Sequence, residues 1–97
     1  MIRREADRIS VEGPVTLATL PTLLAAGARE IQSGARTVDL RGVTELDSAG
    51  VALLLEWRRA ALATRADLTV EGLGPRLESL ASLYGVEDLL PRPAGAG

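Results

Sequence analysis

The chain has 97 residues and a formal net charge of −2, and it contains neither cysteine nor histidine. Disulfides, thiol nucleophiles and a Ser-His-Asp triad are therefore excluded, and the acidic balance disfavours nucleic-acid binding, which usually needs a basic stripe. Histidine is also the commonest metal ligand and general base, so we expect no metal site, no cofactor and no catalytic activity. The N-terminal sequence MIRREADRI lacks the apolar run of a secretory signal, and no apolar run reaches the roughly 18 residues of a membrane span. We therefore expect a cytoplasmic protein.

The first third of the chain predicts two short strands and a helix. Residues 8–12, RISVE, alternate apolar and polar side chains, as a strand with one buried face does. The Gly-Pro pair that follows is a turn signal, so we expect residues 15–17 to pair back as a second strand. Thr19 is a candidate cap for a helix whose apolar residues keep the helical spacing, and Gly34 ends that helix.

The middle of the chain predicts a strand, a long helix and another strand. Residues 36–43, RTVDLRGV, read as a strand through their alternating apolar side chains. An apolar helix begins at Ser48 and runs to about Thr64. Residues 67–73, DLTVEGL, predict the next strand.

The last quarter predicts a third helix that begins at a Gly-Pro pair, residues 74–75, and buries Tyr84 among its apolar residues. Residues 86–92 are expected to dock on the body of the protein, and residues 93–97 to form a flexible tail. The order β-β-α-β-α-β-α predicts one α/β domain over residues 1–92, with a mostly parallel sheet and right-handed crossovers.

Ser48 has three interpretations that the residues leave open. Its hydroxyl is a favoured helix N-cap, and Asp47 before it suits the positive end of the helix dipole. A phosphoryl group on Ser48 would instead add about −1.5 to −2 charge at the carboxyl edge of the sheet, where open α/β sheets place their sites. Nucleophilic catalysis is the weakest interpretation, because the chain contains neither His nor Lys to act as a base.

One flank of the helix behind Ser48 carries small and apolar side chains where charges are usual. On a helical wheel, this flank lies beyond the face that meets the sheet, and it contains Ala49, Leu53, Trp57 and Ala60. Trp57 either folds against a neighbouring element or belongs to a docking strip, because Trp is enriched at interface hot spots. For a docking strip, Trp57→Ala and Leu53→Asp should weaken a complex more than they unfold the free domain.

The sequence VDLRGVTELDSAGVALLLEWRR, residues 38–59, resembles the signature of STAS domains. The shared features are a hydrophobic strand, a Gly turn and an Asp-Ser-x-Gly motif that opens an apolar helix. The resemblance covers nearly the whole chain, and the STAS fold that it implies agrees with the element order above.

Two branches of the STAS family remain open. Anti-sigma-factor antagonists carry a serine at this motif that a partner-switching kinase phosphorylates, and Ser48 would inherit that role. The small cytoplasmic STAS subunit of the Mla phospholipid-transport ABC complex, which maintains outer-membrane lipid asymmetry, is similar in two stretches: ALLLEW at 52–57 and LASLYGVEDLLPR at 80–92. Threonine often occupies the Ser48 position in that second branch, which keeps the first branch open.

We favour the Mla branch, which implies a non-enzymatic subunit that binds and supports the ATPase of an ABC transporter, peripheral to the inner membrane through its partner. The expected partner-binding residues are Asp47, Ser48, Ala49, Gly50, Leu53 and Trp57. A third hypothesis is a lipid or nucleotide ligand at GLGPR, residues 72–76, but turn and helix-start roles explain these residues better.

Overall fold

The computed structural model describes residues 1–93, which form a five-stranded sheet in the order β1-β2-β3-β4-β5. The strands are β1 (Ile2–Glu5), β2 (Arg8–Val15), β3 (Thr37–Leu46), β4 (Thr69–Glu71) and β5 (Arg92–Pro93). β1 is antiparallel to β2, and every other neighbouring pair is parallel. The predicted α/β class with a mostly parallel sheet is confirmed.

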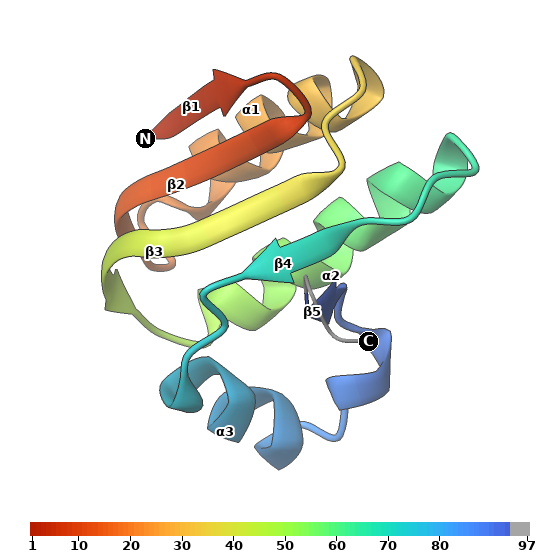
Figure 1. The fold of residues 1–97 in the computed structure, drawn as a ribbon. Coiled ribbons are helices and arrows are strands. Elements are labelled where there is room, and N and C mark those ends of the chain that lie inside the picture. The colour runs from red at the N-terminus through yellow and green to blue at the C-terminus, as the bar shows by residue number, and fades with distance from the viewer. Residues whose placement is uncertain (94–97) are drawn as a thin grey trace.

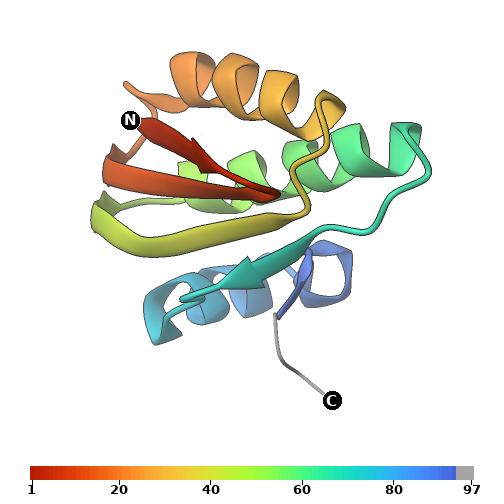
Figure 2. The ribbon, with the colours of Figure 1, turned by 45° about the horizontal axis from the view of Figure 1, so that its top comes forward.

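The helices are α1 (Leu20–Gln32), α2 (Ala49–Ala63) and α3 (Pro75–Leu83), with a short 3₁₀ turn, η1 (Glu87–Leu89). α1 and α2 lie side by side on one face of the sheet, and α3 follows β4 and contacts α2 (Figures 1 and 2). No helix within residues 1–93 is long and apolar enough to cross a membrane.

The hydrophobic core lies between the sheet and the helices α1 and α2. Alternate residues of the strands point into it, as the period of two requires. The buried strand residues are Ile9, Val11, Val15, Val38, Leu40 and Val70. On the helix side they meet buried residues of α1 and α2, so one continuous core holds the domain together.

The first hairpin differs from the prediction. The first strand is Ile2–Glu5, and β2 continues from Arg8 through the Gly-Pro pair to Val15. β2 tolerates this pair because its pairing with β3 is irregular there, with register shifts between Ser10 and Glu12 and between Gly13 and Pro14. The predicted turn at residues 13–14 and the predicted strand at 15–17 are therefore wrong.

The C-terminal segment docks on the body, as predicted. Leu90 is buried, and the Arg58 guanidinium of α2 donates a hydrogen bond to the carbonyl of Leu89 at 3.2 Å. Tyr84 departs from the prediction: it follows the last turn of α3 and is 55% exposed. Pro93, the expected start of a flexible tail, pairs with Val70 as part of β5, while residues 94–97 lie outside the described residues.

Candidate functional site

The candidate site is the turn from β3 into α2, at the carboxyl edge of the sheet. β3 ends at Leu46, and α2 begins at Ala49. The backbone N–H of Asp47 donates to the carbonyl of Val15, the last residue of β2, at 3.2 Å. The parallel strands β2 and β3 therefore end together, and the start of α2 emerges where they meet.

Asp47 caps α2 and also holds the neighbouring loop. Its Oδ1 accepts a hydrogen bond from the N–H of Ala49 at 2.7 Å, which satisfies a donor of the first helical turn. Its Oδ2 accepts a hydrogen bond from the N–H of Leu17 at 3.3 Å, in the loop between β2 and α1. One carboxylate thus joins two segments that lie 30 residues apart in the chain.

Ser48 is exposed and does not cap the helix. It occupies the N-cap position, but its side chain makes no capping hydrogen bond, because its backbone is already in the helical region at φ −59° and ψ −17°. The predicted cap is therefore corrected from Ser48 to Asp47. The predicted cap at Thr19 is also wrong. The Thr19 hydroxyl accepts a hydrogen bond from the N–H of Thr16 and makes no capping bond to α1.

The arrangement around Ser48 does not favour nucleophilic chemistry. The nearest acid in the chain, Asp47, has both carboxylate oxygens bound by backbone N–H groups. A carboxylate held in this way is a poor general base for a neighbouring hydroxyl. What the turn offers is an exposed hydroxyl on a rigid support.

Four of the six expected partner-binding residues are buried inside the domain: Ala49, Gly50, Leu53 and Trp57. Trp57 is 0% exposed, and its indole N–H donates to the carbonyl of Leu24 in α1 at 3.4 Å. The expectation of an exposed docking strip is therefore wrong for Ala49, Leu53 and Trp57, and Ala60 is half-buried. The helical wheel identified the flank correctly, but α1 covers it.

Leu17 is an exposed apolar residue beside this turn that the sequence interpretation missed. It lies next to Asp47 through the hydrogen bond described above, and it is 69% exposed. The sequence placed residue 17 in a strand, where an exposed tip could not be recognised. Leu17 and Ser48 together form an exposed surface, which we call the motif surface.

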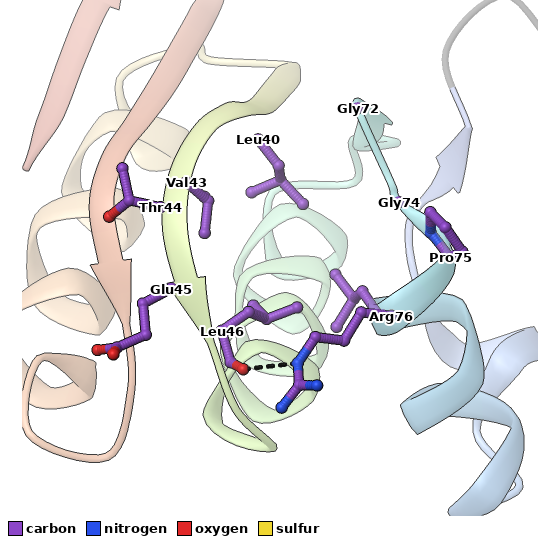
Figure 3. A pocket seen from close by; sticks show the side chains of 10 residues that line it. Leu40, Val43, Thr44, Glu45, Leu46, Gly72, Gly74, Pro75 and Arg76 are labelled. Atoms are coloured by element: carbon purple, nitrogen blue, oxygen red, sulfur yellow. Dashed lines mark hydrogen bonds between the residues drawn. The ribbon is translucent and has the colours of Figure 1, made fainter.

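A pocket of about 320 Å³ lies beside this surface, between the end of β3 and the start of α3 (Figure 3). Leu40, Val43 and Leu46 line it from β3, and Arg76 lines it from α3. Gly74 and Pro75 serve as the N-cap and first residue of α3, which agrees with their predicted helix-start role. Four residues of the GLGPR stretch considered as a ligand site in the sequence also line it: Gly72, Gly74, Pro75 and Arg76. The apolar wall from β3 could not be predicted, because β3 and α3 meet here although they lie about 30 residues apart.

A group of paired charged residues lies on the sheet face opposite α1 and α2, away from the motif surface. Arg8 pairs with Glu71 through two hydrogen bonds, and Arg41 pairs with Asp39 through two more. The hydrogen bond from Arg41 lowers the pKa of the Asp39 carboxyl, and the hydrogen bond from Arg8 lowers the pKa of the Glu71 carboxyl. Each acid is held ionised by an arginine, so this group stabilises the sheet and offers no free acid or base.

Comparison with known proteins gives a family and a fold. The model of the family described as Mlab, STAS domain matches residues 2–91. No curated protein matches the chain. Among solved structures, the anti-sigma factor antagonist SpoIIAA in its unphosphorylated form aligns with a TM-score of 0.69 at 17% identity, over 98% of this chain and 88% of that chain. The Bacillus cell fate determinant SpoIIAA in its phosphorylated form gives a TM-score of 0.66 at 16% identity, over 98% and 91%. At these identities the likeness to SpoIIAA shows the fold alone.

Proposed function

The chain belongs to the Mlab STAS domain family, and from this premise we propose that it is a non-enzymatic subunit that binds the ATPase of an ABC-type phospholipid transporter. In this role it works from the cytoplasmic side, held at the inner membrane by its partner, and supports a transporter that maintains outer-membrane lipid asymmetry. The family match supports the proposal together with the two Mla-like stretches at residues 52–57 and 80–92.

The observation that carries the proposal is the motif surface. Asp47 fixes the start of α2 and the loop at Leu17 against each other, so Ser48 and Leu17 are presented to solvent on a preformed support. A preformed surface loses little conformational entropy when a partner docks, which favours binding. Bound there, the domain stabilises whichever state of the ATPase it binds more tightly.

The test is co-purification with the ABC ATPase subunit of the same organism. We expect the tagged chain to retain the ATPase, and Ser48→Glu to reduce the retained amount, because a carboxylate at this position puts like charge beside Asp47 and changes the docking surface. The matched control is Ser33→Glu, an exposed serine at the far end of α1. If both variants retain equal amounts of ATPase, the motif surface is not part of the interface. If the unaltered chain retains no ATPase, the proposed function is refuted.

A second candidate function is an anti-sigma-factor antagonist that phosphorylation at Ser48 regulates. Ser48 is exposed, and its hydroxyl makes no hydrogen bond to any of residues 1–93, so a kinase could reach it without unfolding α2. The fold neighbour SpoIIAA is known in unphosphorylated and phosphorylated forms. Mass spectrometry of the protein purified from its native host separates the two functions. A phosphopeptide at Ser48 without ATPase in the eluate favours the antagonist, and ATPase without phosphate favours the transporter subunit.

A further inference from the structure

The pocket beside the motif surface has an apolar lining that reaches the core. Leu40 and Leu77 are core residues, 8% and 2% exposed, and they form its floor. Val43 and Leu46 are half-buried and form its rim on β3. Figure 3 shows Leu40, Val43 and Leu46 directed from β3 toward α3. The hollow is therefore suited to an apolar group.

Arg76 places a fixed positive charge at the edge of this hollow. Its Nε donates to the carbonyl of Leu46 at 2.9 Å, which holds the guanidinium at the rim (Figure 3). Arg76 forms no ion pair with any acid in residues 1–93, whereas Arg8 and Arg41 each pair with both Asp39 and Glu71. Glu45, which also lines the pocket, directs its carboxylate away from Arg76 in Figure 3. The guanidinium is therefore free to accept an anionic partner.

The pocket and the motif surface form one packed unit. Leu46 precedes Asp47 directly, and its side chain lies over Gly50 in the first turn of α2. A Cβ on Gly50 would come within 2.5 Å of Cδ1 of Leu46 and 3.2 Å of Cδ1 of Leu77. A protein that covers Ser48 therefore meets the pocket as part of the same surface.

We propose that this pocket receives an apolar side chain of the ATPase partner, with a neighbouring Asp or Glu of that partner paired to Arg76. This inference rests on the proposed function, and it specifies the chemistry of the ATPase segment that docks on this domain. An apolar anchor in a pocket beside an arginine is typical of interface hot spots, and the planar guanidinium matches a carboxylate in two hydrogen bonds. An anionic lipid shares this chemistry, but the continuity of the pocket with the motif surface favours a protein segment.

The first arm of the test measures affinity for the purified ATPase by biolayer interferometry. We expect Arg76→Glu to weaken binding roughly tenfold or more, because an attraction becomes a repulsion, while Arg76→Lys weakens it less. The matched control is Arg29→Glu, which makes the same charge change on an exposed arginine of α1 without an ion pair in residues 1–93. Arg29→Glu should bind like the unaltered chain, and thermal unfolding of each variant checks its fold. Equal affinity of the Arg76→Glu variant and the unaltered chain would overturn the inference.

The second arm tests the pocket independently of the proposed function. The isotope-labelled domain is titrated with acetyl-Glu-Leu-Leu-amide and with its Gln counterpart, and amide shifts are followed by NMR. We expect shifts around residues 43–46 and 74–77 with the Glu peptide, and their loss in Arg76→Gln. No shifts there would overturn the inference even if the ATPase binds. Shifts without ATPase binding would refute the proposed function and the ATPase as occupant, and would leave the pocket as a docking site for an acidic-apolar segment of another protein.

The third arm separates a protein segment from a lipid. The domain is sedimented with vesicles of phosphatidylglycerol and phosphatidylcholine, and with vesicles of phosphatidylcholine alone. We expect no sedimentation with either. Sedimentation with the anionic vesicles that Arg76→Glu abolishes would assign the pocket to a lipid headgroup and overturn the assignment to a protein partner.

Discussion

The indole ring of Trp57 lies directly against Gly27 of α1, so that a Cβ on Gly27 would fall 2.1 Å from two ring carbons. Glycine at this position lets α1 approach α2 closely enough for the ring to fill the space between them. We therefore expect Gly27→Ala to destabilise the domain by about 1–3 kcal/mol, because a rigid ring and a helix backbone must move apart. Urea unfolding followed by tryptophan fluorescence measures the change.

The control for this prediction is Gly74→Ala. Nothing lies within 4 Å of a Cβ at Gly74, and its φ of −82° suits any residue, so only the preference for Gly over Ala at an N-cap remains. The free energy of unfolding should therefore fall less than in Gly27→Ala. Trp57→Phe should relieve part of the penalty of Gly27→Ala, since the ring that the new methyl meets is smaller. Additive effects of the two substitutions would contradict the packing described.

Asp47 and Ser48 should contribute differently to stability although they are neighbours. We expect Asp47→Ala to reduce the free energy of unfolding by about 0.5–2 kcal/mol, the range for loss of a helix cap. Ser48→Ala should stay within about 0.5 kcal/mol of the unaltered chain, since the exposed side chain makes no capping bond. Chemical denaturation of both variants measures the two changes. A larger loss of unfolding free energy for Ser48→Ala than for Asp47→Ala would show that Ser48, and not Asp47, caps α2.

The long elements could be predicted from the sequence because the spacing of their apolar residues marks them, and because Gly34 and Gly85 follow the ends of α1 and α3. The helix after Ser48 lies where the spacing placed it, and the strand before it runs three residues beyond its predicted end at residue 43, to Leu46. Together they locate the motif surface. β1 escaped detection because Ile2–Glu5 has one apolar residue among charges, and because its turn at Ala6 has a φ of 51° without a glycine to mark it.

The burial of Trp57 and the identity of the helix cap could not be predicted, for a different reason. A helical wheel shows which residues share a flank, but it does not show which neighbour covers that flank, and α1 covers the one with Trp57. The choice of cap between Asp47 and Ser48 depends on the direction in which β3 enters α2, which sequence spacing does not specify. Arg76 and Leu46 meet only through tertiary structure.

The ion pairs on the open sheet face should make stability depend on pH in the acid range. The pKa values of Asp39 and Glu71 lie below their ordinary values of 3.8 and 4.5 in the folded state. A lowered folded pKa gives stability that is present above the unfolded value and is lost as the pH falls through the folded value. Stability should therefore hold from neutral pH down to about pH 5 and decline below it.

The variant Glu71→Gln isolates this contribution. It should be less stable than the unaltered chain at pH 7, and the difference should shrink as the pH falls below 4.5, where protonation weakens the same pair in the unaltered chain. Glu5→Gln is the matched control, because Glu5 is exposed and forms no ion pair within residues 1–93. Thermal unfolding at a series of pH values measures both, and a pH-independent difference for Glu71→Gln would argue against the ion pair.

The burial of Leu53 and the exposure of Leu17 lead to opposite outcomes for the same substitution. Leu53→Asp would bury a charge without a partner, at a cost of several kcal/mol, and Trp57→Ala would cost about 3–5 kcal/mol. Both should unfold much of a domain whose total stability is about 5–15 kcal/mol, so their loss of binding would say nothing about an interface.

Leu17→Asp should leave the fold within about 0.5 kcal/mol, because the side chain is already in water, and yet it should reduce co-purification of the ATPase. Leu83→Asp is the matched control, since Leu83 is 76% exposed and lies at the end of α3, outside the motif surface. Circular dichroism melting and co-purification of the two variants separate folding from docking. If Leu17→Asp retains as much ATPase as Leu83→Asp, the loop at Leu17 lies outside the interface, and docking must depend on another surface.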